Sequence, residues 1–254
     1  MIRCIFLLVM LASLFQCVSE LEDPVDTAIY GHDYYPLALG DSRIYQVDSV
    51  QFDLDVEGNP TRDSSRYFIR ELVVEDFENE LGETIYRVQI YRAASAAGPW
   101  AIDGVATRSR TNRQAHYMEG NVRFINLVFP LEEGTSWDGN AFIPDDMVVF
   151  IRGESLQMFS NWEYKVLSEN LSETIGGRVY DEVATVQQVD VENAIERRFS
   201  IEKYAKQIGL IYREREMLDS SCKYTGDLGP CIGKTWSEKA GRGFRLVERL
   251  VDHN

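Results

Sequence analysis

The chain is poor in the residues from which metal and catalytic sites are most often built. It has only three histidines, His32, His116 and His253, and they lie far apart in the sequence. A zinc site needs several His, Cys or acidic ligands at suitable spacing, so this scatter argues against a metal site. The chain also lacks a Gly-x-Ser-x-Gly elbow, a His-Glu-x-x-His pair and a glycine-rich phosphate loop. We therefore expect no metal and no cofactor, and we assign no catalytic residue.

Basic residues are also scarce. The chain has 26 Lys and Arg against 41 Asp and Glu, a formal net charge of -15. Proteins bind nucleic acid mainly through Lys and Arg at the phosphates, so this balance argues against a nucleic-acid partner. It argues equally against electrostatic docking on anionic lipid, whereas a covalent lipid anchor does not depend on the charge of the protein.

An apolar run long enough to matter for targeting occurs only at the start of the chain. Arg3 precedes residues 5–15, which are apolar except for Ser13. This is the length of a signal-peptide core and is too short to span a bilayer. The pattern predicts a lipoprotein-type signal peptide over residues 1–16, with Cys17 as the lipid attachment residue. The protein is then exported and anchored by lipid at the outer membrane, at the cell surface or in the periplasm.

The residues around Cys17 leave a second interpretation open. Gln16 is larger than the residue that normally precedes a lipidated cysteine, and ordinary cleavage after Ser19 would instead give a secreted soluble protein. In either case residues 17–33 form an acidic tether without periodicity.

Two cysteines remain for the folded part of the chain. Cys222 and Cys231 bracket a loop that contains Gly and Pro. In an oxidising compartment such a pair most often forms a disulfide, which would contribute about 2–3 kcal/mol through the closed loop. The alternative is two free thiols in a flexible loop.

From residue 34 onward the sequence has the pattern of strands and shows no long helical periodicity. Val50, Phe52, Leu54 and Val56 alternate with polar residues, and turn residues follow at 57–60. The same reasoning predicts strands at 67–77, 86–90, 162–174, 179–191, 195–204, 208–217 and 244–251, and a hairpin over 105–129 that turns at 119–121. Residues 93–100 read as an open loop, and only 143–160 are compatible with a short helix. We predict one all-β, antiparallel domain over residues 34–254.

Four stretches of this domain carry a resemblance. They are YYPLALGD at 34–41, FPLEEGTSWDGN at 129–140, YAKQIGLIY at 204–212, and the closing strand at 243–254. Together they resemble a group of exported, often lipid-anchored bacterial proteins that are common in Bacteroidetes and mostly uncharacterised. The resemblance implies a strongly curved antiparallel sheet or an open, half-closed barrel in an envelope protein. It implies no activity.

Two acidic segments are candidates for chemistry. Asp53, Asp55 and Glu57 before Gly58 have the spacing of half a calcium loop, but Ser64 stands where that loop needs a glutamate, so we favour a solvated strand face. The second segment, residues 132–146, contains Trp137 and several acids that could serve a glycan-acting hydrolase. Those acids are Glu132, Glu133, Asp138, Asp145 and Asp146. The favoured interpretation is a turn-rich loop with Trp137 packed onto the open end of the sheet.

Two charged stretches are interpreted as structural. Arg213, Glu214, Arg215 and Glu216 alternate in sign, which is typical of a strand that avoids edge-to-edge pairing. The basic stretch 108–113 alternates Arg with small polar residues and is interpreted as a sheet face that balances nearby acids.

These observations favour a non-enzymatic binding or interaction module of the bacterial envelope. We expect it to bind a small molecule, a lipid or a protein on its curved sheet or at the loops that carry Trp100 and Trp137, and to meet the membrane only through its lipid anchor. The alternatives are the hydrolase described above and a structural subunit of a surface complex, which would expose an apolar face.

Overall fold

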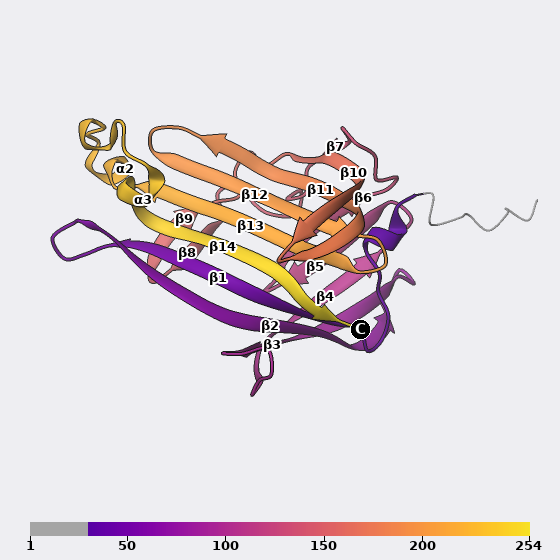
Figure 1. The fold of residues 1–254 in the computed structure, drawn as a ribbon. Helices are drawn as coiled ribbons and strands as arrows, with labels where there is room; N and C mark the ends of the chain where they lie inside the picture. Colours follow the sequence, from indigo (N-terminus) through magenta and orange to yellow (C-terminus); the bar gives the residue numbers. More distant parts are fainter. Residues whose placement is uncertain (1–29) are drawn as a thin grey trace, which may run out of the picture.

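The computed structural model describes residues 30–254, which form one strongly curved antiparallel sheet with a small hairpin beside it (Figure 1). The predicted signal peptide 1–16, the lipid attachment residue Cys17 and the tether up to residue 29 lie outside the described residues. No helix in the described part of the chain is long and apolar enough to cross a membrane.

The strands follow one another with short turns, as the sequence pattern predicts. The main sheet contains β1 (Ser42–Leu54), β2 (Pro60–Glu78), β3 (Thr84–Ala93), β4 (Ala101–Arg110), β5 (Gln114–Glu119), β6 (Val122–Val128), β7 (Ser136–Trp137), β10 (Tyr164–Ile175), β11 (Arg178–Glu192), β12 (Glu196–Ala205), β13 (Gly209–Ser220) and β14 (Ala240–His253). The separate hairpin is β8 (Val148–Ile151) with β9 (Glu154–Gln157). Short helical turns are η2 (His32–Tyr34), α2 (Cys222–Thr225), η3 (Gly229–Cys231) and α3 (Trp236–Lys239).

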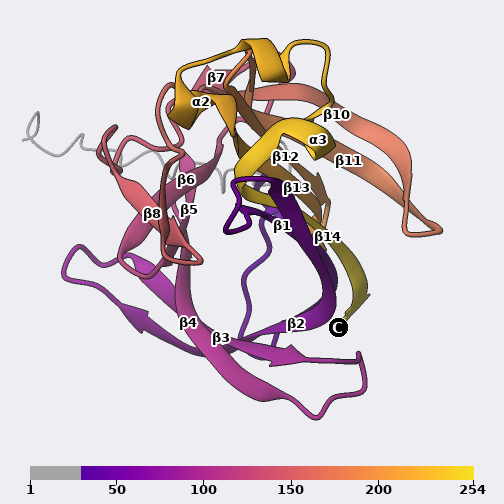
Figure 2. The ribbon, with the colours of Figure 1, turned by 90° about the vertical axis from the view of Figure 1, so that its left-hand side faces the viewer.

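The twelve-stranded sheet curls almost into a closed barrel. Its order is β6-β5-β4-β3-β2-β1-β14-β13-β12-β11-β10-β7, so the first and last long strands, β1 and β14, pair in its middle. Figure 2 shows the strands wrapped around a common axis. The predicted half-closed barrel is therefore confirmed.

The seam of the barrel lies between β6 and the short strand β7. The backbone N–H of Ile125 on β6 donates to the carbonyl of Gly139, at 2.9 Å, and the indole N–H of Trp137 donates to the carbonyl of Ile125, at 2.8 Å. Because β7 has only two residues, these bonds bridge the seam without a continuous ladder.

The segment 143–160, for which a helix was considered, forms the β8–β9 hairpin. The run Val148–Ile151 is rich in β-branched residues, which fit a pleated strand better than a helix. Arg152 and Gly153 both have positive φ, 52° and 87°, as a tight two-residue hairpin turn requires. The predicted hairpin over 105–129 is also more finely divided, since it comprises most of β4 together with β5 and β6.

Strand β1 buries a different face from the one on which Val50, Phe52 and Leu54 alternate with polar residues. Tyr45, Val47 and Ser49 are buried, and the register of β1 does not shift after Tyr45. Val50 and Phe52 therefore lie on the opposite face, and Val56 is fully exposed in the turn that follows. The strand is confirmed, but its apolar alternation marks the outer face.

Residues 30–37 close one end of the barrel, at the opposite end from α2 and α3 (Figure 1). His32 is only 5% exposed, and Tyr34 and Tyr35 belong to the main core. The side chain of Arg110 donates to the carbonyls of His32 (2.7 Å) and Tyr35 (2.9 Å). The packed chain thus includes residues on both sides of the predicted domain boundary at 34.

The other end of the barrel carries the disulfide. Cys222 and Cys231 are bonded, with their Cα atoms 6.3 Å apart, and both are buried. The bond joins α2 to η3 in the segment between β13 and β14, as the sequence predicts.

Candidate ligand site in the barrel interior

Two of the charged residues of β13, Arg213 and Arg215, face the inside of the barrel. Expecting them to protect a sheet edge was wrong, because β13 lies between β12 and β14 in the middle of the sheet. Successive strand residues point to opposite faces, so Arg213 and Arg215 share one face, while Glu214 and Glu216 lie on the other. On that outer face both glutamates accept from Arg245 of β14, at 2.7 and 3.2 Å.

Arg213 is held between carboxylates on both neighbouring strands. Its cross-strand partners are Glu202 on β12 and Glu248 on β14. The Nε of Arg213 donates to Glu202 at 2.7 Å, and its Nη1 donates to Glu248 at 2.9 Å. Glu202 is fully buried and also accepts from the hydroxyl of Tyr204. We call Glu202, Tyr204, Arg213, Arg215 and Glu248 the luminal network.

The two carboxyls of this network have opposite electrostatic behaviour. Burial alone would raise the pKa of Glu202, but Arg213, Arg215 and the hydroxyl of Tyr204 outweigh it and hold this pKa below its ordinary value. For Glu248 burial prevails, and its pKa is raised despite the nearby arginines. The flanking carboxylates keep Arg213 charged, since its pKa lies well above the usual range although burial acts to lower it.

A second buried ion pair lies on another part of the wall. Arg108 of β4 donates to Glu71 of β2 at 2.6 Å, and both side chains are almost completely buried. The guanidinium of Arg108 also lies 5.8 Å and 5.7 Å from the ring centres of Tyr35 and Tyr117. Burial raises the pKa of Tyr35 to about 12. For Arg108, the prediction that the basic stretch balances nearby acids is confirmed.

The luminal network borders a cavity of about 230 Å³ that is partly open to solvent, and we call it the interior cavity because Arg213 and Arg215 line it from the inner face of the sheet. One wall comes from β5 and β6, the other from β11 and β13, and residues next to or within the β8–β9 hairpin cover it. Its lining is Tyr117, Glu119, Val122, Phe124, Asn126, Met147, Val149, Phe159, Gln188, Arg213 and Arg215. Apolar and aromatic side chains therefore face arginine and amide groups across one space.

Asn126 lines both this cavity and a smaller space of about 10 Å³, which Tyr35 also lines. The side chain is 6% exposed, and its Nδ2 donates to the hydroxyl of Tyr204 at 3.3 Å. That hydroxyl gives its own hydrogen to Glu202, so it serves Asn126 as an acceptor. The Asn126 Oδ1 is buried without a hydrogen-bond partner, as is the Nε of Arg215. Buried groups of this kind are rare in folded proteins and often mark functional positions.

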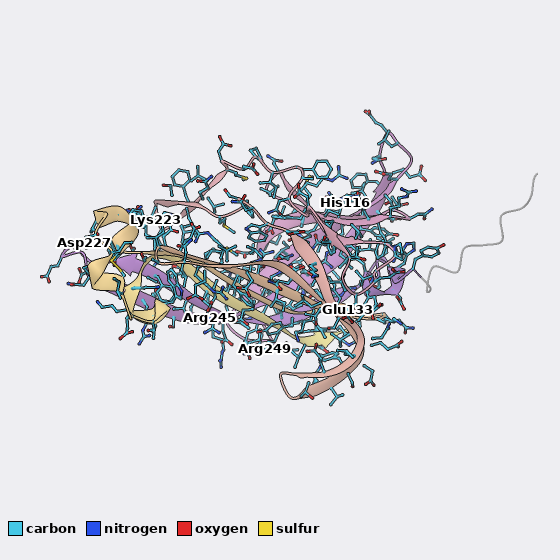
Figure 3. All side chains as sticks on the ribbon, turned by 90° about the horizontal axis from the view of Figure 1, so that it is seen from above. His116, Glu133, Lys223, Asp227, Arg245 and Arg249 are labelled. Atoms are coloured by element: carbon cyan, nitrogen blue, oxygen red, sulfur yellow. A yellow bond between two sulfur atoms is a disulfide. The ribbon has the colours of Figure 1, made fainter. Side chains whose placement is uncertain are left out.

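The acids of residues 132–146 show no comparable organisation. Glu132, Glu133, Asp138, Asp145 and Asp146 are all exposed. Asp138 and Asp145 border one open hollow of about 450 Å³, and the other acids do not line it. Figure 3 shows Glu133, in the loop before β7, well apart from His116 on β5. Within residues 30–254, no group of three or more His, Cys, Asp or Glu side chains is placed to hold a metal ion.

The two tryptophans predicted as ligand loops are engaged in packing. Trp137 is half-buried, bridges the seam through its indole N–H, and packs at a tilt against Tyr164 with the ring centres 5.6 Å apart. Trp100 is also half-buried, and the guanidinium of Arg70 lies 5.1 Å from its ring centre. A ligand role for either remains a prediction.

The half calcium loop at 53–58 forms an ordinary turn. The Oδ1 of Asp55 accepts from the backbone N–H groups of Glu57 (2.9 Å) and Asn59 (2.8 Å). This carboxylate therefore caps its own hairpin turn, as aspartate commonly does.

Sequence reasoning missed Glu202, Glu248, Asn126 and Gln188. The one usable signal was on β12, where Arg198, Ser200 and Glu202 alternate with Phe199 and Ile201. This alternation shows which residues share a face, but not that the polar face is the inner one.

No protein-family model and no curated protein sequence matches this chain. Two solved structures were found to be similar. One is a protein from Bacteroides fragilis NCTC 9343, described as exported and as having a YmcC-like fold; it is 11% identical with a TM-score of 0.38, over 85% of this chain and 98% of that one. The other is described as a lipoprotein from Parabacteroides distasonis ATCC 8503; it is 9% identical with a TM-score of 0.32, over 87% and 98%. Both descriptions are of the kind of envelope protein that the four sequence stretches resemble, but likenesses this weak carry no argument about function.

Proposed function

We propose that this chain is a non-enzymatic binding protein of the bacterial envelope, which holds a small amphipathic molecule in the interior cavity. The observation that supports this proposal is the division of the cavity lining. Phe124, Met147, Val149 and Phe159 offer apolar surface, and Arg213, Arg215 and Gln188 offer polar groups within the same space. Cavities that combine apolar walls with a few convergent polar groups are the usual form of a ligand site.

The size of the cavity limits the ligand. Pockets for drug-sized molecules occupy about 300–1,000 Å³. The interior cavity, at about 230 Å³, is below that range. The part of the ligand that lies inside the cavity is therefore small, and a single short chain or ring system with one polar end suits the space.

A neutral fluorescent probe tests this function. N-phenyl-1-naphthylamine should brighten on binding the native protein, and Val149→Trp, which fills the cavity, should weaken that binding at least fivefold. The matched control is Ile85→Trp, which fills a hollow of about 270 Å³ on the outside of the sheet beside His116 and Met118. Absence of binding to the native protein, or equal loss in both variants, would contradict the proposal.

The proposed location rests on the first residues of the chain. We propose export and anchoring through Cys17 at the outer membrane, at the cell surface or in the periplasm, with secretion after cleavage at Ser19 as the alternative. Labelling with a palmitate analogue in the native host should mark the wild type and not Cys17→Ser. An unlabelled mature protein that begins at Glu20 would refute the anchor and leave export standing.

No specific observation favours either alternative, the glycan-acting hydrolase or the structural subunit of a surface complex. The acids at 132–146 are exposed, and only Asp138 and Asp145 share a hollow. A role as a structural subunit stays a prediction without a defined surface.

A further inference from the structure

The two arginines of β13 that face the interior cavity differ in how their charge is compensated. Arg213 has a glutamate opposite it on each side, Glu202 on β12 and Glu248 on β14. Two residues further along, Arg215 lies opposite Ser200 on β12 and Leu246 on β14. Neither of these neighbours carries a charge.

The one carboxylate within reach of Arg215 is already in use. Its Nη2 is 3.5 Å from the Oε1 of Glu202, an oxygen that accepts from Arg213 at the shorter distance of 2.7 Å. The Nε of Arg215 is buried without a partner. Glu119, an acid on the opposite wall, accepts from the hydroxyl of Tyr117. Of the two arginines that line the interior cavity, Arg215 therefore has the weaker ion pairing.

We infer that Arg215 holds the anionic head of a small carboxylate amphiphile whose apolar part lies against Phe124, Val149 and Phe159. The inference rests on the proposed function and specifies its ligand class. A guanidinium binds a carboxylate through two parallel N–H groups, and such charge-assisted bonds are stronger than those between neutral groups. The side chain of Arg215 is 22% exposed and lines the cavity, so its outer nitrogens can be reached from the cavity.

The charge of the ligand's head group is set by the arginines beside the cavity rather than by the net charge of the chain. The formal net charge of -15 opposes the approach of an anion from a distance. Exposed charges more than about 8–10 Å away are largely screened at physiological salt, whereas a contact inside the barrel is screened much less. With a neutral or cationic head, Arg215 would keep only its 3.5 Å contact to Glu202.

The test compares decanoate with decanol as competitors for the bound N-phenyl-1-naphthylamine. These probes share a chain length and differ in the head group. With the native protein, decanoate should displace the dye at a concentration at least tenfold lower than decanol. Arg215→Gln should abolish this preference and still bind the dye, and Arg215→Lys, which keeps the charge, should retain part of it.

The control is Arg245→Gln, which removes an arginine on the outer face of the adjacent strand β14 (Figure 3). It should leave the preference for decanoate unchanged. Equal competition by decanoate and decanol on native protein that binds the dye would overturn the inference and leave the proposed function intact. Failure of the native protein to bind the dye would instead refute the proposed function. An undiminished preference in Arg215→Gln would show that another group selects the carboxylate.

Discussion

The loop at 132–146 and the luminal network both gather acidic and aromatic side chains, yet the structure treats them in opposite ways. In the loop the acids stand in sequence close to one another and point into solvent. In the network Glu202, Arg213 and Glu248 are distant in sequence and form one buried chain of ion pairs across three strands. Within the network the pKa of Glu202 is lowered by its arginine partners, and the pKa of Glu248 is raised by burial.

The difference follows from strand geometry. Residues opposite each other on paired antiparallel strands lie about 4.5–5.5 Å apart at their Cβ atoms, whereas neighbours along one loop can turn away from each other. Charge interactions in a β protein are therefore arranged across the sheet. A local concentration of acids in the sequence is a poor guide to where they act.

The largest expected effect is a difference in the free energy of unfolding between a variant in the luminal network and a variant in the loop at 132–146. Glu202→Gln should lower the free energy of unfolding by about 3 kcal/mol, because Arg213 and Arg215 lose the buried carboxylate that they share and only Arg213 keeps a second one, Glu248. The matched loop variant Glu133→Gln should leave stability nearly unchanged, since its carboxylate is exposed. Urea denaturation of both variants measures the difference. Similar midpoints for the two would show that the network contributes no more than a surface charge.

The disulfide gives a second effect, at the end of the barrel next to α2 and α3. Replacing Cys222 and Cys231 together with alanine should cost about 2–3 kcal/mol, because the unfolded chain regains the freedom of the closed loop. Reduction of the wild type with dithiothreitol before denaturation should give the same loss. A double variant as stable as the oxidised protein would mean that the loop is held by its packing alone.

The third effect tests whether the loop at 132–146 acts by packing. A Cβ added at Gly139 would come within 2.4–2.5 Å of the ring of Tyr164. Gly139→Ala should therefore destabilise the protein by about 1–3 kcal/mol through overpacking. Asp138→Asn changes an exposed residue one position earlier and should have little effect. Thermal unfolding of both variants measures the difference. If Asp138→Asn lowered the stability more than Gly139→Ala did, the charge of the loop would matter more than its packing against Tyr164.

Much of the fold was predictable because strands carry their own signals. The strands at 179–191 and 195–204 match β11 (Arg178–Glu192) and β12 (Glu196–Ala205) closely, since β-branched and aromatic residues alternate there and turns interrupt them. The disulfide followed from the pairing of Cys222 with Cys231 in a short loop. The curvature of the sheet was implied by family resemblance.

The candidate site could not be predicted, because it depends on the order of strands and on the inner face of each. Arg213 and Arg215 read as edge protection until β13 is placed between β12 and β14. Similarly, the apolar alternation of Val50 and Phe52 favoured one face of β1, although the buried face carries Tyr45 and Val47. Alternation defines two faces, and only the closure of the barrel decides which of them is inside.

The smallest expected effect is a difference in pH dependence within the luminal network. The folded-state pKa of Glu202 is lowered, so its contribution is present above its unfolded pKa of about 4.3 and is lost as the pH falls through the folded value. The folded-state pKa of Glu248 is raised, so its contribution is present below the unfolded pKa and is lost as the pH rises through the folded value.

The cost of Glu202→Gln should therefore grow from pH 4 to pH 7, and the cost of Glu248→Gln should shrink over the same interval, by roughly 1 kcal/mol or less. Urea denaturation of both variants and the wild type at several pH values in this range measures the two slopes. Slopes of the same sign would contradict the opposite shifts of the two pKa values, and would mean that burial does not prevail at Glu248.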